Sequence, residues 1–281
     1  MCGSGDPVVA AGDSAPHSGS LRFALDGQFS TVTAGNESSA GATDSMTEQI
    51  LRASIVYSPT RWANLVLQAP YNRKKQTTTD SDGNVMQNQS VAGLGDVDLG
   101  ARLFVWNSLS MKEMTRQHFA VTLGSTIPTG KNDQAENGAR VDEHLQLGRG
   151  AFGPYVGLMY AFHQDPWNFS ADVADQTYRV NRLGYRYGPS VKWSAMLTYR
   201  PVDALAFTAG IVGRQAQPDR DGGGAVENTG GLLLAAAPGI RVNVAGGLWL
   251  QASAHVPIAQ RLTGVQHVGP MYMVSIQYAM R

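Results

Sequence analysis

The strongest constraint in this sequence is an alternation of apolar and polar side chains that recurs along most of its length. In one stretch, Leu21, Phe23, Leu25 and Phe29 alternate with polar or small neighbours. A period of two sends successive side chains to opposite faces, which is typical of a β-strand. About twelve such segments follow one another, and helical periodicity is almost absent. The expected strands span roughly 21–33, 47–58, 62–73, 94–106, 117–129, 150–163, 166–178, 188–200, 203–215, 229–243, 247–259 and 270–280.

Charged residues occupy only one of the two faces of these segments. Within the strand bodies the apolar face carries no Lys, Arg, Asp or Glu. A soluble barrel with a polar cavity is the alternative, but such a barrel would carry its charges outside, and no helix or second sheet remains to cover the apolar face. Lipid is the remaining partner, because a closed barrel satisfies its backbone hydrogen bonds within hydrocarbon. The opposite face, which we expect to line a lumen, carries Arg22, Asp26, Glu48, Arg52, Asp96, Asp98, Arg102, Asp172, Lys192, Arg200, Arg214 and Arg241.

The connections between expected strands are alternately short and long along the chain. Short connections follow even-numbered segments, as at 59–61 and 201–202, whereas long polar ones follow odd-numbered segments, as at 74–93 and 130–149. This segregation is typical of up-and-down outer-membrane barrels. We therefore expect an all-β, transmembrane, antiparallel up-and-down barrel of about twelve strands, integral to the bacterial outer membrane. The even strand count places both termini on one side, expected to be periplasmic, with the long loops extracellular.

Composition excludes several other classes. Lys+Arg and Asp+Glu both number 22, so the formal net charge is zero and the basic face of a nucleic-acid-binding protein is missing. Apolar residues make up 43%, too many for a disordered chain. The single cysteine, Cys2, excludes an intrachain disulfide and a Cys-based zinc cluster. The longest stretch without Lys, Arg, Asp or Glu, 242–260, contains Asn, Gln, His and Pro and is therefore not a membrane helix.

The N-terminal residues differ from the rest of the chain. Residues 1–20 are rich in Gly, Ser, Ala and Pro and show no strand pattern. We expect a flexible periplasmic segment at 1–20 and the barrel at 21–281. A plug folded into the lumen is the alternative for the first part. Cys2 is either a lipidation site or a free thiol.

Aromatic residues and prolines add detail to the expected wall. Aromatic side chains flank the short turns, as in the interfacial girdle of membrane barrels. The expected girdle comprises Tyr57, Trp62, Trp106, Phe162, Trp167, Tyr199 and Trp249. Prolines interrupt a ladder because they lack an N–H group. Pro154 and Pro238 fall inside expected strands, and the candidates for a lateral gap in the wall are Pro128, Pro238 and Pro257.

Several short motifs occur in a fixed order. They are Gly93–Arg102 (GLGDVDLGAR), Ile127–Lys131 (IPTGK), Pro238–Arg241 (PGIR) and Val256–Ile258 (VPI) followed by Gly264. Together they resemble the bacterial outer-membrane transporter family of the phenol meta-degradation pathway, from about residue 21 to the end. The resemblance implies a barrel linked to uptake of hydrophobic or aromatic compounds.

The charged lumen residues have two interpretations. Asp96, Asp98 and Arg102 share one strand face, where they could form a constriction that selects solutes by charge. Pairing across strands to fill a narrow barrel is the interpretation we favour. Seven basic against five acidic lumen residues give too small an excess to predict anion selectivity. The lumen and constriction candidates are Arg22, Asp26, Arg52, Asp96, Asp98, Arg102, Asp172, Lys192, Arg214, Arg241 and His255.

Enzymatic and metal sites find little support. The six histidines form no metal-ligand spacing, and we expect no metal and no cofactor. Ser253 and His255 share one face of their expected strand, but it is the polar face, whereas an outer-membrane lipase would need them to face lipid. Asp80–Asn84 resembles a calcium loop with a misplaced glycine, so we expect a polar tight turn.

The polar lumen and the family resemblance together predict passive transport of small hydrophobic or aromatic solutes, not enzymatic activity. A plugged barrel that anchors partners is the alternative, and an outer-membrane enzyme ranks third. The expected partners are outer-membrane lipids and lipopolysaccharide, a small-molecule solute and, for the alternative, a periplasmic or outer-membrane protein.

Overall fold

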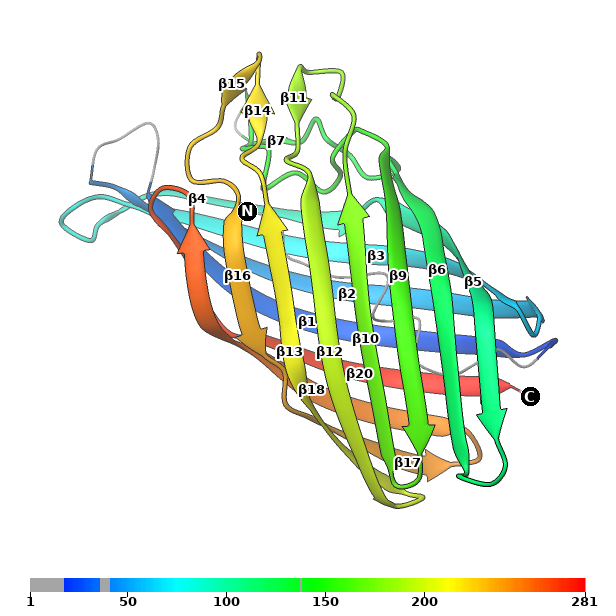
Figure 1. Ribbon diagram of the computed structural model, residues 1–281. Coiled ribbons are helices and arrows are strands. Elements are labelled where there is room, and N and C mark those ends of the chain that lie inside the picture. Colours follow the sequence, from blue (N-terminus) through cyan, green and yellow to red (C-terminus); the bar gives the residue numbers. More distant parts are fainter. Residues whose placement is uncertain (1–17, 36–40, 137, 281) are drawn as a thin grey trace.

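The computed structural model describes residues 18–35, 41–136 and 138–280, and they form an all-β barrel (Figure 1). The expectations for the N-terminal segment and Cys2 fall almost entirely on residues 1–17, outside the described residues. No helix of the described residues is long and apolar enough to span a membrane.

Twelve antiparallel wall strands form a hydrogen-bonded ring, as the sequence predicts. Neighbours in the chain pair in turn, and β1 pairs with β20 from Leu21↔Met280 to Phe29↔Tyr272 to close the ring. Two wall strands are each split in two, β4 with β5 and β16 with β17. The wall strands are β1 (Leu21–Gly35), β2 (Thr43–Thr60), β3 (Ala63–Thr79), β4 (Val85–Leu94), β5 (Val97–Ser110), β6 (Thr115–Ile127), β9 (Gly153–Gln164), β10 (Trp167–Gln176), β12 (Ser190–Val202), β13 (Leu205–Ala216), β16 (Gly231–Ala236), β17 (Gly239–Ala245), β18 (Leu248–Leu262) and β20 (Met271–Met280).

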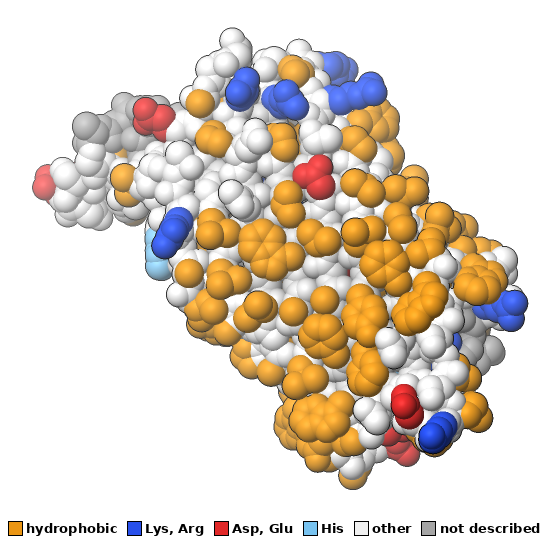
Figure 2. Space-filling view, viewed as in Figure 1, with side chains coloured by type: hydrophobic (Ala, Val, Ile, Leu, Met, Phe, Trp, Pro, Cys, Tyr) orange, Lys and Arg blue, Asp and Glu red, His pale blue; other side chains and the backbone are white. Residues whose placement is uncertain are grey.

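The two faces of the wall have opposite chemistry. Leu51 is 48% exposed, whereas its neighbour Arg52 is only 6% exposed. On the face shown in Figure 2, apolar side chains cover the outer wall and charged groups gather mainly towards the two ends. Asp175, near the long-loop end of β10, is exposed on the same strand face as Val173, so the expectation of an uncharged apolar face is wrong at this position. This is inverted relative to a soluble barrel, and it matches a lipid-facing exterior around a polar lumen.

Among the described residues, all six short strands lie at the long-loop end of the barrel. There β7 (Ala135–Glu136) pairs with β8 (Ala139–Arg140). Strands β11 (Tyr185–Arg186), β14 (Arg220–Asp221) and β15 (Gly224–Ala225) form a separate three-stranded sheet (Figure 1). Another short strand, β19 (Gln266–Val268), pairs with the end of β1.

The connection expected at 74–93 is mostly strand. β3 runs on to Thr79, and β4 begins at Val85 and pairs with β3 up to Leu94. This hairpin extends past the apolar part of the wall, so both of its faces can be polar. This part of β3 and β4 therefore lacks the alternation of apolar and polar residues that predicts a strand.

Prolines in the wall strands are accommodated without loss of the ring. Pro154 is the second residue of β9, where a missing N–H costs little. Pro238 separates β16 from β17, yet hydrogen bonds continue on both sides of the break. The Ala237 N–H donates to the Gly210 carbonyl (2.8 Å), and the Pro238 carbonyl accepts from Ala254 (3.0 Å).

The expected girdle residues lie at the short-turn end with different exposures. Tyr57, Trp62, Trp106, Trp167 and Tyr199 are exposed. The rings of Trp167 and Tyr199 pack at 4.6 Å between centroids, and Phe162 is half-buried. Trp249 differs, because it pairs with Asn243 and Gln277, and its ring lies 5.3 Å from the Arg241 guanidinium.

Candidate solute path through the barrel

The charged residues expected in the lumen come together in the structure. One cavity of about 190 Å³ is lined by Asp26, Arg52, Arg102, Asp172, Lys192, Arg214, Arg241 and His255, among others. Asp96 and Asp98 line a second cavity of about 100 Å³, together with Arg52 and Lys192. Arg22 lies near the short-turn end of β1, on the same face of the strand as the buried Asp26.

The first of these cavities, the largest of the three described in this subsection, has a charged side and an apolar side. Five cationic side chains and two carboxylates, from β1, β2, β5, β10, β12, β13 and β17, form the charged side. The apolar side is formed mainly by β16, β18, β19 and β20, where polar Gln251, Ser253 and Ser275 also line the cavity. Its apolar residues are Leu233, Ala235, Ala237, Pro257, Val268, Met271 and Met273. Met159, Trp193, Met196 and Val212 add apolar groups among the charged residues, so a solute in this cavity would contact both apolar and cationic side chains.

A chain of hydrogen bonds runs along the inner face of the barrel wall from β12 to β5. The Lys192 ammonium donates to the Gln176 side-chain carbonyl (3.2 Å). The Gln176 amide donates to the Thr126 hydroxyl (3.0 Å), which donates in turn to the Asp98 carboxylate (2.5 Å). Pairing across strands therefore accounts for part of the lumen charge.

Asp96 holds a long loop inside the barrel. Its carboxylate accepts the backbone N–H groups of Gly130 (2.9 Å) and Arg149 (2.7 Å), the two ends of the loop. The Thr129 hydroxyl donates to the Gly95 carbonyl (3.1 Å) and accepts the Val97 N–H (3.0 Å). A Cβ added at Gly148 would overlap the Gly130 backbone, so the glycine allows this close approach. Two of the short sequence motifs thus meet at the base of the loop.

The middle of the same loop packs against β2, β3 and β4. Leu145 is fully buried in a cluster with Met46, Val91, Val141 and Leu147. The buried Lys74 ammonium donates to the carbonyls of His144 (2.9 Å) and Gln146 (2.8 Å) and lies 3.7 Å from Glu48. This loop therefore has its own core and is fixed to the wall.

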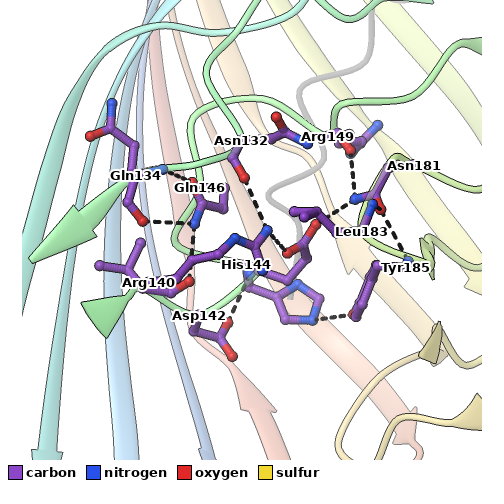
Figure 3. Close-up of polar contacts among 12 residues, drawn as sticks. Asn132, Gln134, Arg140, Asp142, His144, Gln146, Arg149, Asn181, Leu183 and Tyr185 are labelled. Carbon is purple, nitrogen blue, oxygen red and sulfur yellow. Dashed lines mark hydrogen bonds and ion pairs between the residues drawn. The ribbon is translucent and has the colours of Figure 1, made fainter. Parts of the chain in front are cut away.

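Two further long loops interlock with it. Figure 3 shows Asn181 between the loops, where its amide donates to the Arg149 carbonyl (3.2 Å) and to Glu143 (2.7 Å). The Tyr185 hydroxyl donates to Asp219 (2.8 Å) and contacts His144 (3.2 Å). The three loops thus form one hydrogen-bonded layer at the long-loop end of the barrel.

Three neighbouring cavities follow one another beneath and within this layer. The third, of about 90 Å³, is lined by residues of the loops and by Arg214 and Met271 of the wall. Lys192 lines all three cavities. In the described residues, these three small chambers therefore share Lys192 in their lining.

Sequence reasoning missed the loop inside the barrel. The segment 130–149 appears there as a polar connection, and only Val141, Leu145 and Leu147 hint at a buried core. The glycines at 130 and 148 are a second hint, but their meaning depends on a contact across the loop.

The prolines expected at a gap lie in three different settings. Pro128 follows β6 in a tight turn, in which the Thr129 N–H donates to the Ile127 carbonyl (2.8 Å). Pro238 lies in the bonded break between β16 and β17. Pro257 lines the largest cavity, just beyond the point where the pairing of β18 with β20 ends.

Ser253 and His255 both line the largest cavity. At the β3–β4 turn, the Asp80 carboxylate accepts the backbone N–H groups of Asp82 (2.9 Å) and Asn84 (2.7 Å), so its oxygens serve the turn. In the described residues, no group of three or more His, Cys, Asp or Glu is placed to hold a metal ion.

Comparison with known proteins places this fold. A sequence model of the family described as "Putative MetA-pathway of phenol degradation" matches residues 4–263. No curated protein matches the chain significantly. Among solved structures, the chain is similar to the COG4313 outer membrane channel from Pseudomonas putida F1, with 17% identity, a TM-score of 0.71 and 100% coverage of both chains.

Two autotransporter domains are also similar. The translocator domain of NalP from Neisseria meningitidis has 13% identity and a TM-score of 0.51, covering 96% of this chain and 92% of that one. The beta domain of the Bordetella autotransporter BrkA has 12% identity and a TM-score of 0.51, covering 94% and 100%. These likenesses show an outer-membrane type of β-barrel.

Proposed function

Because the chain belongs to the MetA-pathway family of phenol degradation, we propose that it is a passive outer-membrane channel for small hydrophobic or aromatic solutes. Solutes would move down their gradient, through the chambers of the lumen. The similar structure from Pseudomonas putida F1 is itself described as an outer membrane channel, which supports the proposal.

The observation that carries the proposal is the two-sided cavity in the barrel. An apolar cavity of roughly 150 Å³ is enough to hold benzene. The largest chamber, at about 190 Å³, therefore suits a solute with a single ring. Its apolar side would hold the ring, and its cations would favour a hydroxyl or anionic substituent.

Orientation is part of the same proposal. Leu21 pairs with Met280, so the first and last wall strands begin and end at the same side of the wall. We place this side in the periplasm and the interlocked loops outside the cell, as in other outer-membrane barrels.

Uptake by whole cells tests the proposal. Cells with and without the protein are given radiolabelled toluene and benzoate at low concentration, and initial uptake rates are compared at matched expression. We expect faster uptake in cells that contain the protein. Equal rates for both solutes would refute the channel proposal.

The interlocked loops favour a second candidate function, a plugged barrel that anchors a partner. Single-channel recording of the refolded protein distinguishes the two, once heat-modifiable migration on a gel confirms folding. A steady ohmic current supports an open lumen. Silence together with a stable co-purifying protein supports the anchor.

A further inference from the structure

The barrel wall is incomplete between β18 and its neighbour on the β1 side. β18 pairs with β20 only from Leu248↔Tyr278 to His255↔Met271. Beyond His255, β18 continues to Leu262 and pairs with β16 alone. On the other side, β19 pairs with β1. In the described residues, no strand pairing joins β19 to the upper part of β18.

The Gln260 side chain spans the middle of this interruption, and at its loop end the Gln266 amide donates to the carbonyls of Thr263 (2.6 Å) and Gly230 (3.4 Å). The Gln260 amide donates to the Val268 carbonyl (2.8 Å), and its side-chain oxygen accepts the Val268 N–H (2.9 Å). A carboxamide carries the same donor and acceptor as a peptide group, so Gln260 replaces a pair of ladder bonds. Unlike a ladder, it can rotate away without disturbing the backbone pairing of Gln260 with Leu233.

Prolines mark the edges of the interruption. Continuing the register past His255↔Met271 would set Val256 opposite Pro270 and Pro257 opposite Gly269. Neither proline has an N–H group to donate across the gap. In hydrocarbon an unpaired donor is costly, so their placement lowers the penalty of leaving this wall segment open.

The interruption lies between the largest cavity and the lipid-facing surface. Pro257, Val268, Gly269 and Met271 line the cavity from both edges. On the outer face Val256 and Ile258 are 41% and 57% exposed. A path through the wall at this place would thus be bordered by apolar groups, on the apolar side of the cavity.

We propose that the interval between residues 256–262 of β18 and residues 266–270 is a lateral port for uncharged apolar or aromatic solutes, closed by the Gln260 side chain. Solutes would pass between the lumen cavity and the surrounding lipid without crossing the loop layer. Charged solutes would stay in the lumen, because leaving it would strip them of water. This port rests on the proposed channel function and specifies its route.

Cross-linking across the port tests the inference. In a Cys2→Ser background, Gln260→Cys with Val268→Cys is closed by a short bifunctional thiol reagent. The matched control is Ala252→Cys with Val274→Cys, which joins register partners of the same region where the ladder is intact. We expect the linked port variant to lose its protein-dependent toluene uptake, whereas the linked control keeps it. Benzoate uptake should be unchanged in both.

Gln260→Leu provides a second test that needs no reagent. It removes both bonds to Val268 and should raise toluene uptake without raising benzoate uptake. Equal toluene uptake by the linked and unlinked port variants would overturn the lateral port while leaving the channel proposal intact. If the unmodified protein itself takes up neither solute faster than cells without it, the channel proposal fails, and the port fails with it.

Discussion

Replacing Asp96 should release the loop from the lumen. In Asp96→Asn one side-chain oxygen can still accept an N–H from Gly130 or Arg149, but the new NH₂ group would face the other donor. A hydrogen bond to a charged group contributes about 1.5–3 kcal/mol net. Each 1.4 kcal/mol is a factor of about ten in an equilibrium constant, so the open population should rise roughly tenfold to a hundredfold.

Limited proteolysis measures this population. Lys131 and Arg140 are exposed trypsin sites within the loop. When opening is fast relative to cleavage, the cleavage rate follows the open population. Mass spectrometry of peptides ending at these two residues should therefore show faster cleavage in Asp96→Asn by the same factor.

The matched control is Asp133→Asn, which removes one charge from an exposed position of the same loop. It should leave cleavage close to that of the unmodified protein. If Asp96→Asn is cleaved no faster than Asp133→Asn, Asp96 does not hold the loop, and the account of the loop base is wrong. Single-channel conductance gives an independent reading, since a released loop should make the current larger or noisier.

Three further predictions concern other parts of the barrel. Lys74→Met removes two hydrogen bonds to loop carbonyls and leaves the buried Glu48 carboxylate without this cation, so it should cost about 2–5 kcal/mol of stability. The temperature at which the barrel loses its folded migration on a gel should fall in Lys74→Met and stay the same in the exposed Lys75→Met. Arg214→Gln removes one of five cavity cations, so in a salt gradient its reversal potential should shift towards cation preference; an unchanged potential would place the ion path elsewhere. Hydrogen bonds from the Asn84 side chain and backbone lower the pKa of the exposed Asp80. Because the pKa of Asp80 is lower in the folded state, the stabilisation of the turn by its carboxylate is present above the ordinary Asp pKa and is lost as pH falls through the lowered pKa. An NMR titration should show the lowered pKa of Asp80, and Asn84→Ala should raise this pKa towards the ordinary value.

The wall was predictable because its information is local. Alternation decides which face of a strand meets lipid, and Leu51 and Arg52 show the result, one exposed outside and the next buried in the lumen. Strand ends were less predictable at the long-loop side. Beyond the apolar part of the wall, as in β3 and β4, both faces are polar and the alternation that identifies a strand disappears.

The lumen residues were predictable only as a set. Parity places Asp96 and Asp98 on one face, but it does not reveal that Asp98 joins a hydrogen-bonded chain to Lys192 while Asp96 binds a loop. Trp249 illustrates the same limit, because its position beside a short turn suggests a girdle, whereas its register aligns it with Asn243 and Gln277 and its ring lies near Arg241.

The sequence by itself determined the strand count, the antiparallel ring and the inverted placement of apolar and charged residues. These follow from period-two patterning against lipid, which each strand expresses alone. Tertiary structure alone decided that one loop folds into the lumen, that three loops interlock and that Gln260 bridges a break in the wall. Each of these depends on partners that no local pattern specifies. Asp96 binds an N–H group 53 residues away. The break at Gln260 exists because the upper part of β18 pairs with β16, whereas β19 pairs with β1.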